Sequence, residues 1–214
     1  MSETARHQCF IYEGSPLKHL PKLAAELKRM LKANYRCLYL NNPTMMSEMR
    51  SHLISAGVDV LEETASGRLI LSSVQGRPAD GAFDGEEMLK QLEETVHRSL
   101  QEGYAGLWAT GDMSWEIGEE NDPLKLLKYE WGLEELFRRQ PALCGICQYH
   151  VDTLPSDMSR QALLSHKSVF LSETLSRLNP FYIPPASFAG DVPPLPELIE
   201  MLALLDRLEP SEKE

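Results

Sequence analysis

The chain has 214 residues, 43% of them apolar, which is enough to bury one sizeable core and scarcely enough for two ordinary domains. Acidic residues outnumber basic ones, 32 against 21, so direct binding of nucleic-acid phosphates is disfavoured over most of the surface. No run approaches the ~20 consecutive apolar residues of a membrane span, and the N-terminus lacks a signal-peptide pattern, so we expect a cytoplasmic protein.

Short β-rich runs alternate with longer stretches of helical period over the first 150 residues. The expected strands are QCFIYE (8–13), RCLYLN (36–41), RLILSS (68–73), YAGLWAT (104–110) and ALCGICQYH (142–150). Between them, apolar residues recur along one helical stripe over residues 17–31 and along another over residues 88–100. This alternation predicts a three-layer α/β fold, with a mainly parallel sheet flanked by helices.

Several strands are expected to lead directly into helices. A capping side chain precedes a proline suited to the first helical position at Ser15-Pro16, Asn42-Pro43 and Asp122-Pro123, and Asp84 can start a helix in the same way. In open α/β sheets the carboxyl ends of the strands form the usual ligand crevice. Binding residues are therefore expected just beyond the strands.

The alternation weakens after about residue 155. A proline-rich stretch, NPFYIPPASF (179–188), precedes an amphipathic stretch, PELIEMLALLDRL (196–208). We divide the chain into one domain, residues 1–186, and a C-terminal amphipathic helix with an acidic tail, residues 187–214. That helix could pack on the domain, form a homodimer with a second copy, or contact a signalling partner.

The loop after the first expected strand, YEGSPLKHLPK (12–22), is a poor phosphate cradle. It holds Gly14 and Lys18 but lacks the second glycine and the Lys-Ser or Lys-Thr pair, and Pro16 removes an amide donor. The chain also has no G-x-S-x-G and no H-E-x-x-H motif. We therefore expect a protein that is not an enzyme. The alternative is a residual nucleotide hydrolase or transferase using Glu130 or Asp112 as its base.

Four cysteines, at positions 9, 37, 144 and 147, are expected to be reduced thiols. Cys144, Cys147 and His150 have a C-x-x-C-x-x-H spacing that would suit zinc or a redox pair. Along a strand, however, Cys144 and Cys147 point to opposite faces, so we expect no metal and no cofactor. A metal site would need the fold to bring in His7, Cys9 or His166.

Two further positions leave alternatives open. Asp112 and Trp115 follow the fourth expected strand, where they form either a plain surface turn or part of a binding edge. Glu130 lies at the border of a buried helical stripe and is either a structural anchor or a polar group facing a pocket.

Several motifs in order resemble the MEDS domain, a sensory domain named for methanogens, methylotrophs and a dichloromethane-responsive regulator. They are HQCFIYEG, CLYLNN, GAFDGEEML, GYAGLWATGDMSW, LLKYEWGLEELF, CQYH and NPFYIPP, and they extend from about His7 to Pro185. The resemblance implies a divergent RecA/KaiC-like P-loop fold that has lost its phosphate loop. It also implies a module that detects small hydrocarbon derivatives and works with histidine kinases or transcription regulators.

The resemblance also suggests where a ligand would bind. Motif positions with polar or aromatic side chains are occupied by His7, Tyr12, Asp112, Trp115, Glu130, Gln148 and Tyr149, and we add Phe83 as an aromatic contact. His150 stands where the family commonly has an acid. We expect a non-catalytic sensory domain that binds a small, partly apolar organic ligand and signals through a protein partner. The alternative from another class is an interaction scaffold without a ligand.

Overall fold

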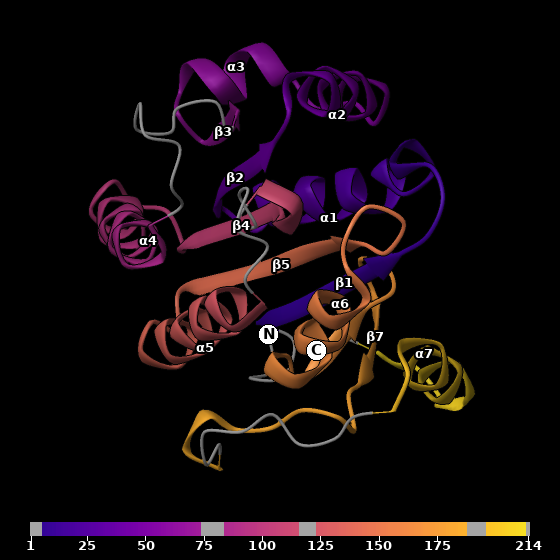
Figure 1. Ribbon diagram of the computed structural model, residues 1–214. Helices are drawn as coiled ribbons and strands as arrows, with labels where there is room; N and C mark the ends of the chain where they lie inside the picture. The colour runs from indigo at the N-terminus through magenta and orange to yellow at the C-terminus, as the bar shows by residue number, and fades with distance from the viewer. Residues whose placement is uncertain (1–5, 74–83, 116–122, 188–195, 213–214) are drawn as a thin grey trace.

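The computed structural model describes residues 6–73, 84–115, 123–187 and 196–212. These residues build an eight-stranded sheet with the order β3-β2-β4-β5-β1-β6-β7-β8 (Figure 1). The strands are β1 (His7–Tyr12), β2 (Arg36–Asn41), β3 (Leu69–Ser73), β4 (Leu107–Asp112), β5 (Leu143–His150), β6 (Ser168–Phe170), β7 (Leu175–Leu178) and β8 (Ser211–Glu212). Strands β1 to β6 pair in parallel, whereas β7 and β8 are antiparallel additions. All five strands expected from the sequence are confirmed.

Helices connect the strands. They are α1 (Leu20–Lys32), α2 (Pro43–Ser55), α3 (Val60–Ala65), α4 (Gly85–Gln101), α5 (Pro123–Arg139), α6 (Ser156–Ser165) and α7 (Leu198–Arg207), with short 3₁₀ turns η2 (Pro16–Lys18), η4 (Met113–Trp115) and η5 (Pro185–Ser187). Asn42 and Asp84 cap α2 and α4 through their side chains, as expected. Ser15 makes no such cap, because the 3₁₀ turn η2 precedes α1. Asp122 lies outside the described residues.

The helices form two layers, one on each side of the sheet (Figure 1). Buried residues of α1, α2 and α3 share one core with the strands, and we call this side the α1 face. Buried residues of α4, α5, α6 and α7 share a second core, on the α5 face. The chain therefore has the predicted three-layer α/β architecture. Helix α7 packs on the α5 face through Met201 and Leu205.

Strand β5 shows how neighbouring residues separate between the two faces. Cys144 and Ile146 belong to the core of the α1 face, whereas Cys147 and Tyr149 belong to the core of the α5 face. This follows from the two-residue period of a strand. All four cysteines are buried and free.

Strands β1 and β5 are neighbours, yet the helices that follow them cover opposite faces. Helix α1 follows β1 onto the α1 face, and α6 follows β5 onto the α5 face. In open α/β sheets, ligands bind beyond the carboxyl ends of two strands that diverge in this way. In the part of the chain that the structure describes, no helix combines the length and apolar character that crossing a membrane would require.

Candidate functional site

The residues predicted to bind a ligand do not form one group. His7, Glu130 and Tyr149 meet on the α5 face. The remaining described side chains, those of Tyr12, Asp112 and Gln148, belong by strand alternation to the α1 face. Phe83 lies outside the described residues, and of Trp115 the structure describes only the backbone. The expected single constellation is therefore corrected to two, because the sheet separates them.

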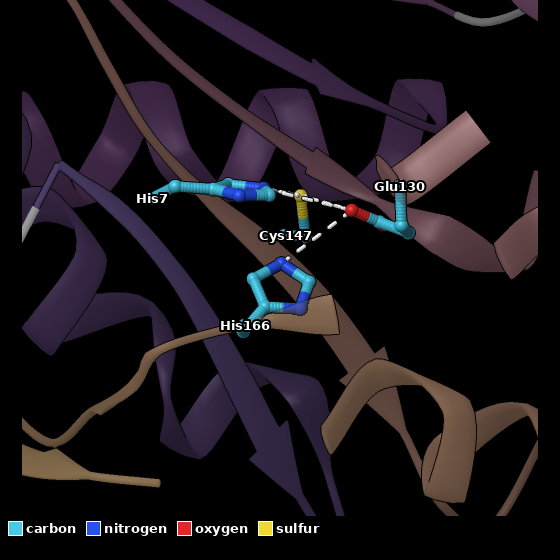
Figure 2. Close-up of side chains that lie close together, drawn as sticks. All are labelled: His7, Glu130, Cys147 and His166. Atoms are coloured by element: carbon cyan, nitrogen blue, oxygen red, sulfur yellow. Dashed lines mark hydrogen bonds and ion pairs between the residues drawn. The ribbon is translucent and has the colours of Figure 1, made fainter. Parts of the chain in front are cut away.

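The first group is a buried cluster formed by His7, Glu130, Cys147 and His166 (Figure 2). Nε2 of His7 and Nε2 of His166 each lie 3.5 Å from Oε2 of Glu130. Sγ of Cys147 lies 3.6 Å from that same oxygen and 3.6 Å from Nε2 of His7. All four side chains are buried, and Figure 2 shows them pointing toward one another.

Hydrogen bonds on the outer side hold both imidazole rings of the buried cluster in place. Nδ1 of His7 lies 3.0 Å from Oε2 of Glu134, and Nδ1 of His166 lies 2.7 Å from the carbonyl oxygen of Ala162. Because both partners are hydrogen-bond acceptors, each neutral imidazole carries its proton on Nδ1. The unprotonated Nε2 of each ring then faces the centre of the cluster. Glu134 is itself held by Lys167, whose Nζ lies 3.0 Å from Oε1.

The members of the buried cluster shift one another's pKa values. Burial raises the pKa of Glu130, but the influence of His166 and His7 and the hydrogen bond donated by Tyr149 outweigh burial, and this pKa lies below its usual value. Burial lowers the pKa of His7, yet its bonds to Glu130 and Glu134 raise it overall. Burial and the neighbouring His7 lower the pKa of His166 to about 4. The cluster therefore holds a carboxylate beside one neutral imidazole.

A missing side chain makes room for His7. Gly145 is the register partner of His7, and a Cβ there would lie 2.4 Å from the carbonyl oxygen of Ala109 and 3.1 Å from Phe137. The Phe137 ring stacks on the His7 ring, with centroids 4.3 Å apart and an interplanar angle of 13°. Glycine at position 145 thus lets α5 approach the sheet closely enough to reach His7.

The second group, which we call the edge group, lies at the carboxyl ends of the strands. Tyr12 and His150 are register partners on β1 and β5, and their rings stack with centroids 4.9 Å apart at 9°. Asp112 is the last residue of β4. Burial of Tyr12 raises its pKa most, and the nearby charge of Asp112 raises this pKa further. Gln148 is the register partner of Asp112 and donates a 2.9 Å hydrogen bond to Thr110.

The loop that follows β1, beside the edge group, binds a carboxylate from the segment after β5. The amide of Gly14 donates a 2.7 Å hydrogen bond to Oδ2 of Asp152, and Nε2 of His150 lies 3.3 Å from that same oxygen. A phosphate loop would direct such an amide at its nucleotide. Here an internal anion has taken that position, in agreement with the degraded motif expected from the sequence.

Sequence reasoning left Cys147 and His166 out of the predicted site. A usable signal existed for Cys147, because it lies two residues before Tyr149 and so shares its face of the strand. For His166 there was none, since its position depends on how the end of α6 packs beside β1.

Comparisons with known proteins agree with this architecture. A family model described as "MEDS: MEthanogen/methylotroph, DcmR Sensory domain" matches residues 6–167. No curated protein was found to match the chain. Among solved structures, the flagellar accessory protein FlaH from Methanocaldococcus jannaschii is similar, with 17% sequence identity, a TM-score of 0.51, and coverage of 82% of this chain and 79% of that chain. At this identity the likeness shows a shared RecA-like fold alone.

Proposed function

The chain belongs to the MEDS family of sensory domains, and from this premise we propose that it binds a small, partly apolar organic ligand at the edge group. It would do so without catalysing a reaction and would pass the signal to a protein partner. The observation that carries the proposal is the stacked pair Tyr12 and His150, located where α1 and α6 depart to opposite faces. Ligands of open α/β folds bind at this place.

The chemistry of the edge group favours an uncharged or cationic ligand over a nucleotide. Aromatic faces at Tyr12 and His150 offer apolar contact, and the carboxylate of Asp112 offers a hydrogen-bond acceptor. Asp152 already bonds the Gly14 amide, so a phosphate would meet negative charge there. Small alcohols, amines and halogenated hydrocarbons suit this surface better than ATP or GTP.

The signalling surface that we propose is the outer side of α7. Met201 and Leu205 anchor this helix on the α5 face, whereas Ile199 and Leu204 stay 77% and 41% exposed. A partner such as a histidine kinase or a transcription regulator would cover them. A ligand changes that contact only to the extent that its affinity differs between two conformations of the domain.

Thermal unfolding with a panel of small organic compounds tests this proposal. A compound present at about 100 times its Kd should stabilise the chain by about 2.7 kcal/mol, which raises Tm by about 5–10 °C. Tyr12→Leu should abolish that rise. Tyr104→Leu is the matched control and should retain it, because Tyr104 precedes β4 and so lies at the amino ends of the strands, away from the edge group at their carboxyl ends.

Three results would count against the proposal. One is a panel in which no compound raises Tm, and another is an equal rise in wild type and Tyr12→Leu. Turnover of ATP or GTP that disappears in Asp112→Asn would instead support an enzyme.

A further inference from the structure

The buried cluster is a second site, on the other face of the sheet from the edge group. Its four ligating atoms come from β1, α5, β5 and the segment between α6 and β6, and they all lie within 4.8 Å of one another. We propose that this cluster binds one divalent first-row transition metal ion, with Zn²⁺ as the expected occupant. The ligands would be Nε2 of His7, Oε2 of Glu130, Sγ of Cys147 and Nε2 of His166.

Distances within the cluster match a tetrahedral site. Zinc bonds to nitrogen and oxygen measure about 2.0–2.2 Å and to sulfur about 2.3 Å, which places neighbouring ligand atoms about 3.3–3.8 Å apart. Four of the six distances between ligand atoms are 3.5, 3.5, 3.6 and 3.6 Å, within this range, and all six are at most 4.8 Å. The two nitrogen–oxygen contacts, at 3.5 Å, are long for direct hydrogen bonds, and all four contacts suit atoms that share a central cation.

His166 gives an independent reason to place a cation there. Its Nδ1 faces a carbonyl oxygen, which only accepts, so a neutral His166 carries its proton on Nδ1. Nε2 then presents a lone pair toward the Glu130 carboxylate, and this buried nitrogen has no hydrogen-bond partner among the residues that the structure describes. Two electron-rich atoms facing each other in the interior are unfavourable. A metal ion between them turns this repulsion into two bonds.

The surroundings of the cluster are those of a metal site. Histidines that bind metals donate their other N–H to a carboxylate or a backbone carbonyl. Glu134 and the carbonyl of Ala162 fill these two roles for His7 and His166. The Tyr149 hydroxyl donates to the second oxygen of Glu130, which leaves Oε2 free for the centre.

Charge and ligand type select the class of metal. One carboxylate and one thiolate together balance a divalent cation, so the occupied site is neutral and its burial is less costly. Imidazole and thiolate ligands suit zinc and its neighbours rather than Ca²⁺ or Mg²⁺. Metal binding requires the thiolate and both unprotonated Nε2 atoms, and the displaced protons pass to solvent. Four protein ligands without an open position are typical of a structural site.

The metal site goes beyond the proposed function and does not depend on it. Reduced full-length chain, stripped with a chelator and reloaded with Zn²⁺ alone, should contain one zinc ion per chain by elemental analysis. With Co²⁺ alone it should show the intense visible bands of a tetrahedral site together with a thiolate-to-cobalt charge-transfer band.

Two cysteine variants on β5 show which thiolate produces the charge-transfer band. Cys147→Ser should lose the charge-transfer band and bind Zn²⁺ at least about 10-fold more weakly. Cys144→Ser should retain both the band and the affinity, because Cys144 faces the other core. The measurements on wild type stand even where Cys147→Ser fails to fold.

The metal proposal is overturned if wild type binds neither Zn²⁺ nor Co²⁺ at one ion per chain. It is also overturned if Cys147→Ser keeps the charge-transfer band, or if Cys144→Ser alone loses it. None of these results affects the stabilisation by small organic compounds at the edge group, so failures of the two proposals are distinguishable.

Discussion

Each face of the sheet buries a glutamate to 1% exposure, and the two glutamates are held in different ways. Glu26 is part of α1, and Arg29, three residues later on the same helix, donates two 2.8 Å hydrogen bonds to its carboxylate. The Arg29 side chain remains 36% exposed. Glu26 therefore has a charged partner that reaches water and comes from the same helix.

Glu130 is held by residues from other parts of the chain. Its neighbours are His7, Cys147, Tyr149 and His166, all of them buried and contributed by three other parts of the chain. A local ion pair is sufficient to hold Glu26, whereas the four side chains that converge on Glu130 exceed what the burial of an acid requires.

The largest expected effect comes from removing each glutamate in turn. Glu130→Ala should lower the free energy of unfolding by about 3–5 kcal/mol, because it breaks a buried charge network and leaves a cavity. Glu26→Ala should cost only about 1–2 kcal/mol, since Arg29 can turn to solvent. Urea unfolding of both variants measures the difference. Equal losses would remove the contrast between the two faces.

Metal removal should act on one face only. With Zn²⁺ at about 100 times its Kd, stripping the ion should lower the stability of wild type by about 2.7 kcal/mol. Glu26→Ala should respond to the chelator as wild type does, and Glu130→Ala should not respond. A Tm that is insensitive to the chelator in every variant would contradict a bound ion.

A smaller effect is expected from Glu134, which is not a proposed ligand but orients His7 by a hydrogen bond. Glu134→Gln weakens the acceptor that orients His7 and should reduce Zn²⁺ affinity by about 10–100-fold. Glu135→Gln is the matched control, because this neighbour on α5 is exposed and pairs with Arg138. Competition titrations with a zinc chelator compare the two variants. If both bind zinc equally tightly, Glu134 has no part in orienting His7.

The smallest effect on stability is expected at α7. Ile199→Asp should change the free energy of unfolding by less than about 0.5 kcal/mol, because Ile199 is exposed. Met201→Asp, on the buried side of the same helix, should cost several times more. Thermal unfolding separates the two. Sedimentation of wild type and Ile199→Asp then shows whether two copies associate through this surface.

Much of the fold could be predicted because the signals are local. The first five strands are short apolar runs, and Asn42 and Asp84 cap helices by contacts within their own turn. Strands β6, β7 and β8 were not expected, since they have only three, four and two residues. Such short strands form because a neighbour is already in place.

The candidate site was harder to predict because it depends on which face a residue occupies. Gln148 and Tyr149 were assigned to one pocket, yet adjacent residues of a strand point to opposite sides. Strand alternation alone would have grouped Cys147 with Tyr149. The contribution of His166 required the three-dimensional packing of α6 and β1, which no local pattern encodes.

The position of β1 has a consequence for how the protein is made. This strand is synthesised before the other strands of its sheet, but it pairs with β5 and β6, whose residues lie more than 130 positions later. At about 5–20 residues per second, the nascent β1 waits on the order of ten seconds for these neighbours. During this time both of its edges can pair with other chains. Cells producing this domain should therefore depend on chaperones that shield its first strand until translation has passed β6.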